Sequence, residues 1–382
     1  MRKWICALLA AVLLLMPFVT ANAEQEEAPS QAKSYIMIDA GSGNVLGEGN
    51  ADEQLPCASV IKTMSILLVM EAIDDGRIAP HDTVTISAHA SSMGGTQVFL
   101  DVNTTHKVED LLKAVIVCSA NDAIVALAEK VAGSEEEFVA MMNKKAQVMG
   151  LGAHFVNANG LSADGQTMSA RDIATVCREL ARHDLFYTWS GIWMDYYVHP
   201  DGRETEMVNA NRMVRYYDGC DGICTGSSSE AGYCMAGTVK RSGGRFIYVS
   251  LGSPNSAARF EEASNAFDYA FAGFTAKTIV REGQQLAKNL EVAGGTKTLV
   301  GVYAAEEFAA LIEKGKEDTL EKELVLLEEV TAPLCAGDSV GYLRILLDGE
   351  EIGRVDAIVK QDVSELNFAS AIKKIMTWWL FS

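Results

Sequence analysis

The stretch Ala58-Ser59-Val60-Ile61-Lys62 begins an apolar run that predicts a helix from Ser59 to about Asp75. A serine three residues before a lysine places a hydroxyl and an amine on one face of that helix, one turn apart. Free serine is a poor nucleophile, but a buried lysine with a lowered pKa can take its proton. Taken alone, the pair is also typical of a helix N-cap followed by a solvated lysine. The rest of the chain has to decide between these interpretations.

Length and charge limit the class of protein. The 382 residues are nearly half hydrophobic and carry a net charge of −19. This length predicts two domains with a large buried core. No basic stripe offsets the acidity, which disfavours nucleic acid as a partner and general attraction to an anionic membrane. We expect a globular protein that binds no nucleic acid.

The first residues have the pattern of a secretory signal. A basic start, the apolar run Trp4–Val19 and the small residues Ala21-Asn22-Ala23 follow one another. A membrane anchor is the alternative, but the run is short, so cleavage after Ala23 is favoured. Residues 24–33 are polar and predict a flexible linker. The mature protein is therefore expected outside the cytoplasm, either secreted or at the outer face of the cytoplasmic membrane.

Cysteine usage predicts free thiols. Loss of Cys6 with the signal would leave an odd number of cysteines, scattered through apolar segments unlike a dense disulfide framework. Buried thiols without partners are the expectation. No Cys-x-x-Cys spacing indicates a metal site, and no cofactor or metal is predicted. The remaining cysteines are Cys57, Cys118, Cys177, Cys220, Cys224, Cys234 and Cys335.

Hydrophobic periodicity places strands at both ends of a first domain and helices between them. This order predicts an α/β domain of the α+β kind, in which an antiparallel sheet is closed by its two ends and a helical cluster lies alongside. The predicted strands are 34–39, 45–48, 222–226, 233–239 and 245–251, and the other predicted helices are 107–131 with a break at 118–122, 135–151, 170–182 and 265–271.

The chain changes character near Phe274. Residues 275–363 contain short strand-like runs, glycine-containing turns and no long helix, which predicts a small all-β domain. The tail over residues 364–382 is apolar and aromatic with two lysines, and it is too short to span a bilayer. It predicts an amphipathic helix on a membrane surface, with a helix docked on the protein itself as the alternative. The strand-like runs are 276–281, 299–303, 323–330, 340–347 and 354–360.

Two further motifs follow the serine–lysine pair in order. They are Ser119-Ala120-Asn121 and, on a predicted strand, Cys224-Thr225-Gly226. Together the three correspond to the ordered motifs of penicillin-binding proteins and β-lactamases.

With the segments around these motifs, residues 34–274 resemble the D-alanyl-D-alanine carboxypeptidases, the low-molecular-mass penicillin-binding proteins. Residues 275–382 resemble that family's β-rich C-terminal domain and membrane-binding helix. The segments that carry the resemblance are Pro56–Lys62, Ser92–Gln97, Ser119–Ala123, Asp221–Gly226 and Glu230–Cys234.

This resemblance implies a serine-type hydrolase. It would remove the terminal D-alanine from peptidoglycan stem peptides through an acyl-enzyme on Ser59, and β-lactam antibiotics would acylate the same serine. Lys62 would be the general base. Ser119 would relay a proton to the leaving amine, and Asn121 would bind the peptide backbone.

The resemblance also implies a substrate-binding strand. Thr225 and Arg259 would bind the terminal carboxylate. The backbone N–H groups of Ser59 and Ser227 would form the oxyanion hole. Gly226 would leave space for the substrate beside the strand edge.

One position departs from the family pattern. The third motif normally begins with lysine, and here that substrate-site position is Cys224. A thiol supplies neither the charge nor the hydrogen bonds of an ammonium group, and the expected penalty is about 10²- to 10³-fold in turnover. Cys224 could also be a thiolate stabilised by Lys62, or pair with Cys57 or Cys118.

The substitution leaves a second function open. A catalytically weakened or inactive penicillin-binding-like module would hold stem peptides or partner proteins without cleaving them. A β-lactamase is disfavoured, because no Glu-x-x-x-Asn element lies between the second and third motifs.

Overall fold

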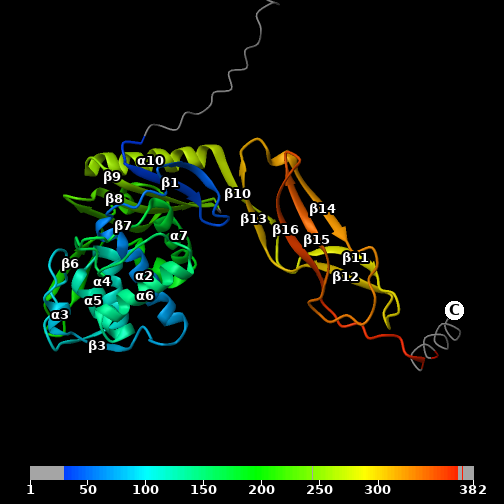
Figure 1. Ribbon diagram of the computed structural model, residues 1–382, viewed down its shortest axis with the longest axis horizontal. Helices are drawn as coiled ribbons and strands as arrows, with labels where there is room; N and C mark the ends of the chain where they lie inside the picture. Colours follow the sequence, from blue (N-terminus) through cyan, green and yellow to red (C-terminus); the bar gives the residue numbers. More distant parts are fainter. Residues whose placement is uncertain (1–29, 243, 369–371, 373–382) are drawn as a thin grey trace, which may run out of the picture.

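The computed structural model of the chain describes residues 30–242, 244–368 and 372. The predicted signal peptide over residues 1–23, most of the predicted linker and most of the predicted amphipathic helix over residues 364–382 lie outside the described residues. Figure 1 shows a mixed α and β body followed by a smaller all-β domain. The sequence predicted both an α+β first domain and a small all-β second domain, and both predictions are confirmed.

A five-stranded antiparallel sheet, in the order β2-β1-β9-β8-β7, is the centre of the first body. β1 (Ser34–Asp39) pairs on one side with β2 (Val45–Gly49) and on the other with β9 (Gly244–Ser253). β8 (Gly232–Arg241) joins β9 to β7 (Cys220–Ser228), which lies at the edge. The predicted closure of the sheet by strands from both ends is confirmed.

Helices cover both faces of this sheet (Figure 1). Successive side chains of a strand point to opposite faces, so Ile36 and Ile38 of β1 pack in the large core with the helical cluster, while Met37 packs with Phe267 of α10 (Ser256–Gly273). The elements of the helical cluster are η1 (Ala58–Ile61), α2 (Lys62–Asp74), α3 (Ala88–Ser91), α4 (Val108–Cys118), α5 (Asn121–Ala132), α6 (Glu135–Val148), α7 (Ala170–Leu180) and α8 (Asp184–Ser190).

Local capping chemistry sets several helix ends. The hydroxyl of Ser134 accepts the backbone N–H of Glu137 at the start of α6. Ser169 and Asp172 form a reciprocal capping box at the start of α7. Asn255 caps α10 by accepting two backbone N–H groups. This cap makes α10 start earlier than the predicted helix over residues 265–271, which was too short.

The structure also differs from the sequence prediction near the first motif and between the helices. The predicted helix from Ser59 begins as the 3₁₀ turn η1, and α2 starts only at Lys62. A hairpin of β5 (Met194–Val198) and β6 (Glu204–Val208) was not predicted, and the short helix α9 (Met213–Tyr216) follows it. Another short pair, β3 (Thr83–Thr85) and β4 (Thr105–Lys107), was also missed.

The C-terminal domain is built from strands alone apart from the short 3₁₀ turn η2 (Glu317–Thr319), within residues 274–365. β10 pairs with β13, and five further strands form an antiparallel sheet in the order β11-β12-β16-β15-β14. β11 and β13 were not predicted. The bounds are β10 (Phe274–Val280), β11 (Gln285–Glu291), β12 (Leu299–Ala304), β13 (Phe308–Glu313), β14 (Leu320–Leu326), β15 (Ser339–Leu347) and β16 (Glu350–Val359). None of the helices in the described ranges combines the length and apolarity needed to cross a bilayer.

The packing of α10 generates a stability prediction. Phe267 is fully buried between the rings of Tyr217 and Tyr248. Phe267→Ala leaves a cavity under the sheet and is expected to lower the free energy of unfolding by about 3 to 5 kcal/mol. Urea denaturation followed by circular dichroism measures the change. Glu261→Ala, at an exposed position of the same helix, is the control, and equal stability of the two variants would contradict the packing described.

Candidate active site

The serine–lysine pair lies where η1 passes into α2. Lys62 Nζ donates a hydrogen bond to Ser59 Oγ at 3.1 Å. Ala58, directly before the serine, has a φ of 48°, which is uncommon for a residue with a side chain. Cys57, not Ser59, occupies the cap position of η1. The interpretation as an N-cap serine with a solvated lysine is therefore wrong, and the pair has the geometry of a nucleophile and its base.

Burial sets the protonation of Lys62. The side chain is only 1% exposed. Desolvation lowers the pKa of Lys62 to about 7, and interaction with Cys224 and Cys118 offsets only part of that shift. A large fraction of the amine is therefore neutral near neutral pH, and a neutral amine can accept the proton of Ser59.

The second motif forms the break between two helices. Ser119 ends α4 in the left-handed conformation, with φ of 63°, and α5 begins at Asn121. The predicted interruption at 118–122 is confirmed. Ser119 Oγ is buried and has no hydrogen-bond partner among the described residues. Asn121 Nδ2 donates to Gly94 O at 2.8 Å, while its Oδ1 has no such partner.

The third motif lies on β7 and comes close to the backbone of Ser59. A Cβ atom at Gly226 would come within 2.7 Å of the backbone nitrogen of Ser59 and 3.1 Å of Cys57 O. Glycine is required here because two backbones approach each other closely. Gly226 also lines the cavity, and the space for the substrate beside it stays a prediction.

Cys224 is a neutral thiol. It is 9% exposed, and burial raises its pKa to about 12, although the cations of Lys62 and Arg259 act in the opposite direction. The interpretation as a thiolate is therefore wrong. All seven cysteines between Cys57 and Cys335 are free, which contradicts a disulfide from Cys224 to Cys57 or Cys118 and confirms the prediction of unpaired thiols; Cys335 alone of them is exposed. Position 224 thus carries no charge.

Arg259 brings a buried cation from α10 to the end of β7. It is 6% exposed, and its Nη1 donates to Gly226 O and Cys234 O, both at 3.1 Å. No carboxylate of the described residues pairs with it. Desolvation lowers its pKa, and Arg212 contributes in the same direction. A buried guanidinium without a carboxylate partner favours an anionic ligand.

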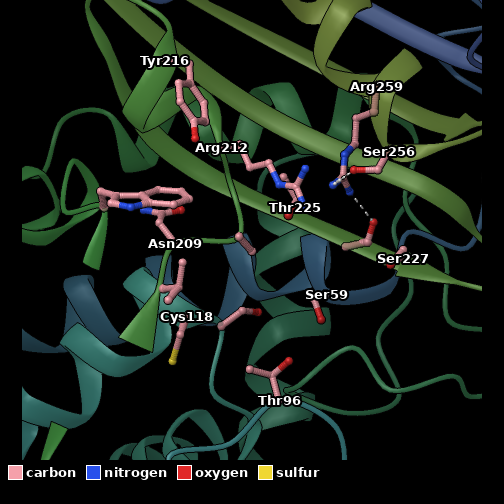
Figure 2. A pocket seen from close by; sticks show the side chains of 15 residues that line it. Ser59, Thr96, Cys118, Asn209, Arg212, Tyr216, Thr225, Ser227, Ser256 and Arg259 are labelled. Carbon is pink, nitrogen blue, oxygen red and sulfur yellow. Dashed lines mark hydrogen bonds between the residues drawn. The ribbon is translucent and has the colours of Figure 1, made fainter. Parts of the chain in front are cut away.

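One cavity of about 640 Å³ is lined by most of the predicted residues, and Figure 2 shows Ser59, Thr225, Ser227 and Arg259 among the side chains around it. Ser59, Ser119, Thr225, Gly226, Ser227 and Arg259 line it. Lys62, Asn121 and Cys224 do not line it, and all three are buried. The cavity is lined in addition by residues that the sequence did not single out: Thr96, Cys118, Trp193, Val208, Asn209, Ala210, Arg212, Tyr216 and Ser256.

These missed residues have little signature in the sequence. Thr96 falls inside a segment that carries the resemblance, Ser92–Gln97. Trp193, Asn209 and Arg212 flank the unpredicted hairpin β5–β6, so no motif marks them. Only the fold brings the segments on either side of that hairpin to the cavity.

The comparisons with known proteins agree with this geometry. The family described as D-alanyl-D-alanine carboxypeptidase matches residues 20–255, and the family described as penicillin-binding protein 5, C-terminal domain, matches residues 274–365. The chain belongs to the D-alanyl-D-alanine carboxypeptidase family and is a hydrolase of the serine type. The resemblance inferred from the motifs is confirmed.

Individual relatives extend over both domains. The D-alanyl-D-alanine carboxypeptidase DacF of Bacillus subtilis is 34% identical over 386 residues, which cover 99% of each chain. Penicillin-binding protein 5 of Haemophilus influenzae superposes with a TM-score of 0.79 at 31% identity, over 88% of this chain and 99% of that chain. Penicillin-binding protein D2 of Listeria monocytogenes, in an ampicillin-bound form, superposes with a TM-score of 0.57 at 26% identity, over 64% of this chain and 98% of that chain.

The burial of Lys62 generates a prediction that needs no substrate. Its side-chain NMR signal is expected to titrate with a midpoint near pH 7, because desolvation disfavours the ammonium form. Lysine labelled with ¹³C at Cε reports the titration, and the loss of one signal in Lys62→Arg assigns it. A midpoint near the ordinary value for lysine would contradict the proposed base.

Proposed function

We propose that the chain is a serine-type D-Ala-D-Ala carboxypeptidase, which removes the terminal D-alanine from peptidoglycan stem peptides through an acyl-enzyme on Ser59. The single observation that carries the proposal is the hydrogen bond of 3.1 Å from the buried amine of Lys62 to Ser59 Oγ, at the wall of a cavity that Arg259 also lines. Membership of the family and the long relatives supports the same activity.

Acylation would use groups that already lie together. Neutral Lys62 takes the proton of Ser59, whose oxygen attacks the carbonyl carbon before the last D-alanine. The backbone N–H groups of Ser59 and Ser227 then stabilise the oxyanion. This assignment is supported by the close approach of Gly226, the residue before Ser227, to the nitrogen of Ser59. Water finally hydrolyses the ester.

The remaining groups would handle the leaving amine and the substrate. Ser119 lines the cavity and its Oγ has no other partner in the described part of the chain, which suits a proton relay. Thr225 and Arg259 hold the terminal carboxylate. Asn121 would bind the peptide backbone through its Oδ1, which has no partner in the described part of the chain, and through the second hydrogen of Nδ2, since only one is used in the bond to Gly94 O.

Position 224 favours a second candidate function. A lysine there would place an ammonium group near Ser119 and the substrate carboxylate, whereas the thiol is neutral and Ser119 Oγ is left without a donor. Turnover about 10²- to 10³-fold below that of a lysine-containing site follows if the ammonium counts as one oxyanion-hole donor. A site weakened further would act as a module that binds stem peptides or partner proteins.

The cellular setting is part of the proposal. Residues 1–23 would direct export and be removed, and residues 34–274 would be the peptidase domain. The β-rich residues 275–363 would lead to a tail, 364–382, that lies on the outer face of the cytoplasmic membrane. β-Lactams would acylate Ser59 and stall there, an expectation supported by the ampicillin-bound Listeria relative.

Intact-mass spectrometry after incubation with a penicillin tests the proposal. Wild type is expected to gain one penicilloyl adduct, which Ser59→Ala lacks because the nucleophile is gone. D-alanine release from a stem pentapeptide then measures turnover. Cys224→Lys is the matched variant, and an adduct seen only with it would mean that Cys224 has silenced the site and that the binding module is correct. No adduct on any correctly folded variant would contradict the proposed nucleophile.

The pH dependence of acylation gives a separate prediction. The rate of adduct formation is expected to rise with pH and level off above about 7, because Lys62 accepts a proton only when neutral. Cys224→Lys adds an ammonium group beside Lys62, so the midpoint of this rise is expected to move to lower pH. Adduct formation timed across the neutral range measures both midpoints. A rate that falls with rising pH would exclude Lys62 as the base.

A further inference from the structure

Two buried histidines lie away from the serine–lysine pair and take no part in the proposed reaction. His106 of β4 is 6% exposed, and His199, directly after β5, is 4% exposed. Their ring centres are 6.2 Å apart, and the ring centre of Tyr197 lies 5.6 Å from the first and 5.0 Å from the second. Burying an imidazole is costly unless its nitrogens are hydrogen-bonded, so their partners show what the pair does. The remaining histidines are exposed or only partly buried, and they are His81, His89, His154 and His183.

Hydrogen bonds define which nitrogen of His106 carries its hydrogen. Thr104 Oγ1 donates to Asp101 O at 2.5 Å, so it can only accept from His106 Nε2, 2.8 Å away. Nδ1 is then the acceptor of the neutral ring, and it receives the hydroxyl of Tyr197 at 2.8 Å. Burial raises the pKa of Tyr197, which keeps this hydroxyl a donor. Both nitrogens of the neutral ring are satisfied, and a proton on Nδ1 would displace the bond from Tyr197.

His199 has the same arrangement. Thr205 Oγ1 donates to Val98 O at 3.2 Å, so it accepts from His199 Nε2 at 2.9 Å. Nδ1 faces Nη2 of Arg203 at 3.3 Å, and a guanidinium group can only donate. A proton on this Nδ1 would place two donors and two positive charges against each other. The hydrogen bonds of the structure therefore require both rings to be neutral.

These contacts fasten the tip of the hairpin β5–β6 to residues 98–101. Arg203 Nη2 donates to Phe99 O at 2.9 Å and to Asp101 Oδ2 at 2.7 Å. From the other side, the carboxylate of Asp122 accepts two backbone N–H groups of the same segment, at 3.2 and 3.1 Å. The segment is thus held between the hairpin and α5. We call four side chains the histidine lock: His106, Tyr197, His199 and Arg203.

Both segments that the histidine lock joins lead into the active-site cavity. Trp193 and Val208, at the base of the hairpin, line it. Thr96, two residues before the other segment, lines it as well, and its carbonyl oxygen accepts the N–H of Asn121 at 2.7 Å. His106 itself lies two residues before α4, the helix that leads to the second motif. The histidine lock is therefore connected to the wall of the cavity and to the second motif.

The surroundings of the two rings favour their neutral forms. Burial has the largest effect and lowers the pKa of both. His199 and Arg203 lower the pKa of His106 further, and Arg203 does the same for His199. Asp110 of α4 helps to raise the pKa of Tyr197. Three carboxylates act on one ring or both in the opposite direction, without reversing the result, and they are Asp101, Asp122 and Asp201.

We propose that His106 and His199 are positioning residues which, as neutral imidazoles, fasten the hairpin β5–β6 to the cavity wall, and that acid unfastens the hairpin by protonating them. A detached hairpin binds these protons with the ordinary histidine pKa of about 6.5. The fastened hairpin binds them more weakly, so its stability is fully present above about pH 6.5 and is lost as the pH falls below that value. The histidine lock does not depend on the reaction, whereas its effect on turnover rests on the proposed function.

Hydrogen exchange followed by mass spectrometry measures the histidine lock without substrate. After correction for the pH dependence of intrinsic exchange, the protection of residues 194–208 is expected to fall roughly 10- to 30-fold between pH 6.5 and 5.5, because each detached ring takes up a proton. β8 is the internal reference.

The double variant His106→Gln/His199→Gln keeps an amide donor and acceptor at each position but no titrating ring. Its protection is expected to change less than about twofold over the same range, because no proton is taken up on opening. His81→Gln, at an exposed histidine, is the matched control and is expected to behave as wild type. An equal fall in wild type and in the double variant would overturn the proposal.

NMR titration of ring-¹⁵N-labelled histidines decides the matter even if the double variant is already open at neutral pH. The signals of His106 and His199, assigned by the single variants, are expected to show hydrogen on Nε2 and to titrate below the midpoints of the exposed histidines. Arg203→Gln removes the charge that faces His199 and is expected to move its midpoint to higher pH. Arg182→Gln, at an exposed arginine, is expected to leave it unchanged. Ordinary midpoints in wild type, or no shift in Arg203→Gln, would overturn the proposal.

Adduct formation with a penicillin tests whether the histidine lock positions the site. Of the groups invoked, only Lys62 titrates in the double variant, whereas wild type also loses the histidine lock. The wild-type rate at pH 5.5 relative to pH 7.5 is therefore expected to be lower than that of the double variant, by at most the roughly 30-fold loss of protection. Equal ratios in the two proteins would refute the positioning role.

The failure of the proposed function has a different signature. If no protein forms an adduct, the proposed enzyme is refuted, while exchange and NMR still decide on the histidine lock. Calorimetric binding of an N-acylated D-Ala-D-Ala peptide at the two pH values then replaces the rate. Equal affinity ratios in wild type and the double variant would refute the positioning role in the same way.

Discussion

The close contact between the edge strand β7 and the turn η1 is the constraint on which the site depends. Gly226 lies so near the backbone nitrogen of Ser59 that no side chain fits between them. The contact joins two segments that are far apart in sequence, one carrying Ser59, the proposed nucleophile, and the other Thr225, which is proposed to bind the substrate carboxylate. The large core behind η1 and α2 then holds Lys62 away from water. The lowered pKa of Lys62 and the position of Thr225 beside Ser59 in one cavity both follow from this arrangement.

The order of the strands explains why this contact can exist. β1 and β9 come from the two ends of the first body and pair at the middle of the sheet, which leaves β7 at the rim. An edge strand has unpaired backbone groups on one side, and those groups can face a ligand. α10 packs on the far face and delivers Arg259 to the end of the same strand. Functional side chains from the helical cluster and from α10 therefore meet at the edge strand of the sheet.

Much of the fold was predictable from the sequence because local patterns were strong. The hairpin over residues 34–49, the break at Ser119 and the capped helices α6 and α7 follow from turn residues, small polar residues and periodicity. The hairpin β5–β6 was not predicted, since its burial depends on neighbours brought by the fold rather than on its own alternation. α10 was predicted too short because the cap at Asn255 was overlooked.

The candidate site likewise contains residues that the sequence predicted and residues that only the structure showed. Ser59, Lys62, Ser119 and Thr225 stand in motifs whose spacing is visible in the chain, and the structure brings them together. Arg212 and Trp193 belong to no motif, because only the folded chain brings the segments that flank β5–β6 to the cavity. The charge state of Cys224 also needed the structure, since burial and not sequence decides whether a thiol ionises.

The free, buried cysteines have a consequence for where this fold can exist. From Cys57 to Cys234, six thiols are enclosed by the first body without forming a cross-link. A disulfide stabilises a protein only as long as the surroundings keep it oxidised. The described residues hold together by packing and hydrogen bonds instead, so no cross-link is lost when the surroundings are reducing. Formation of this fold therefore does not require an oxidising compartment.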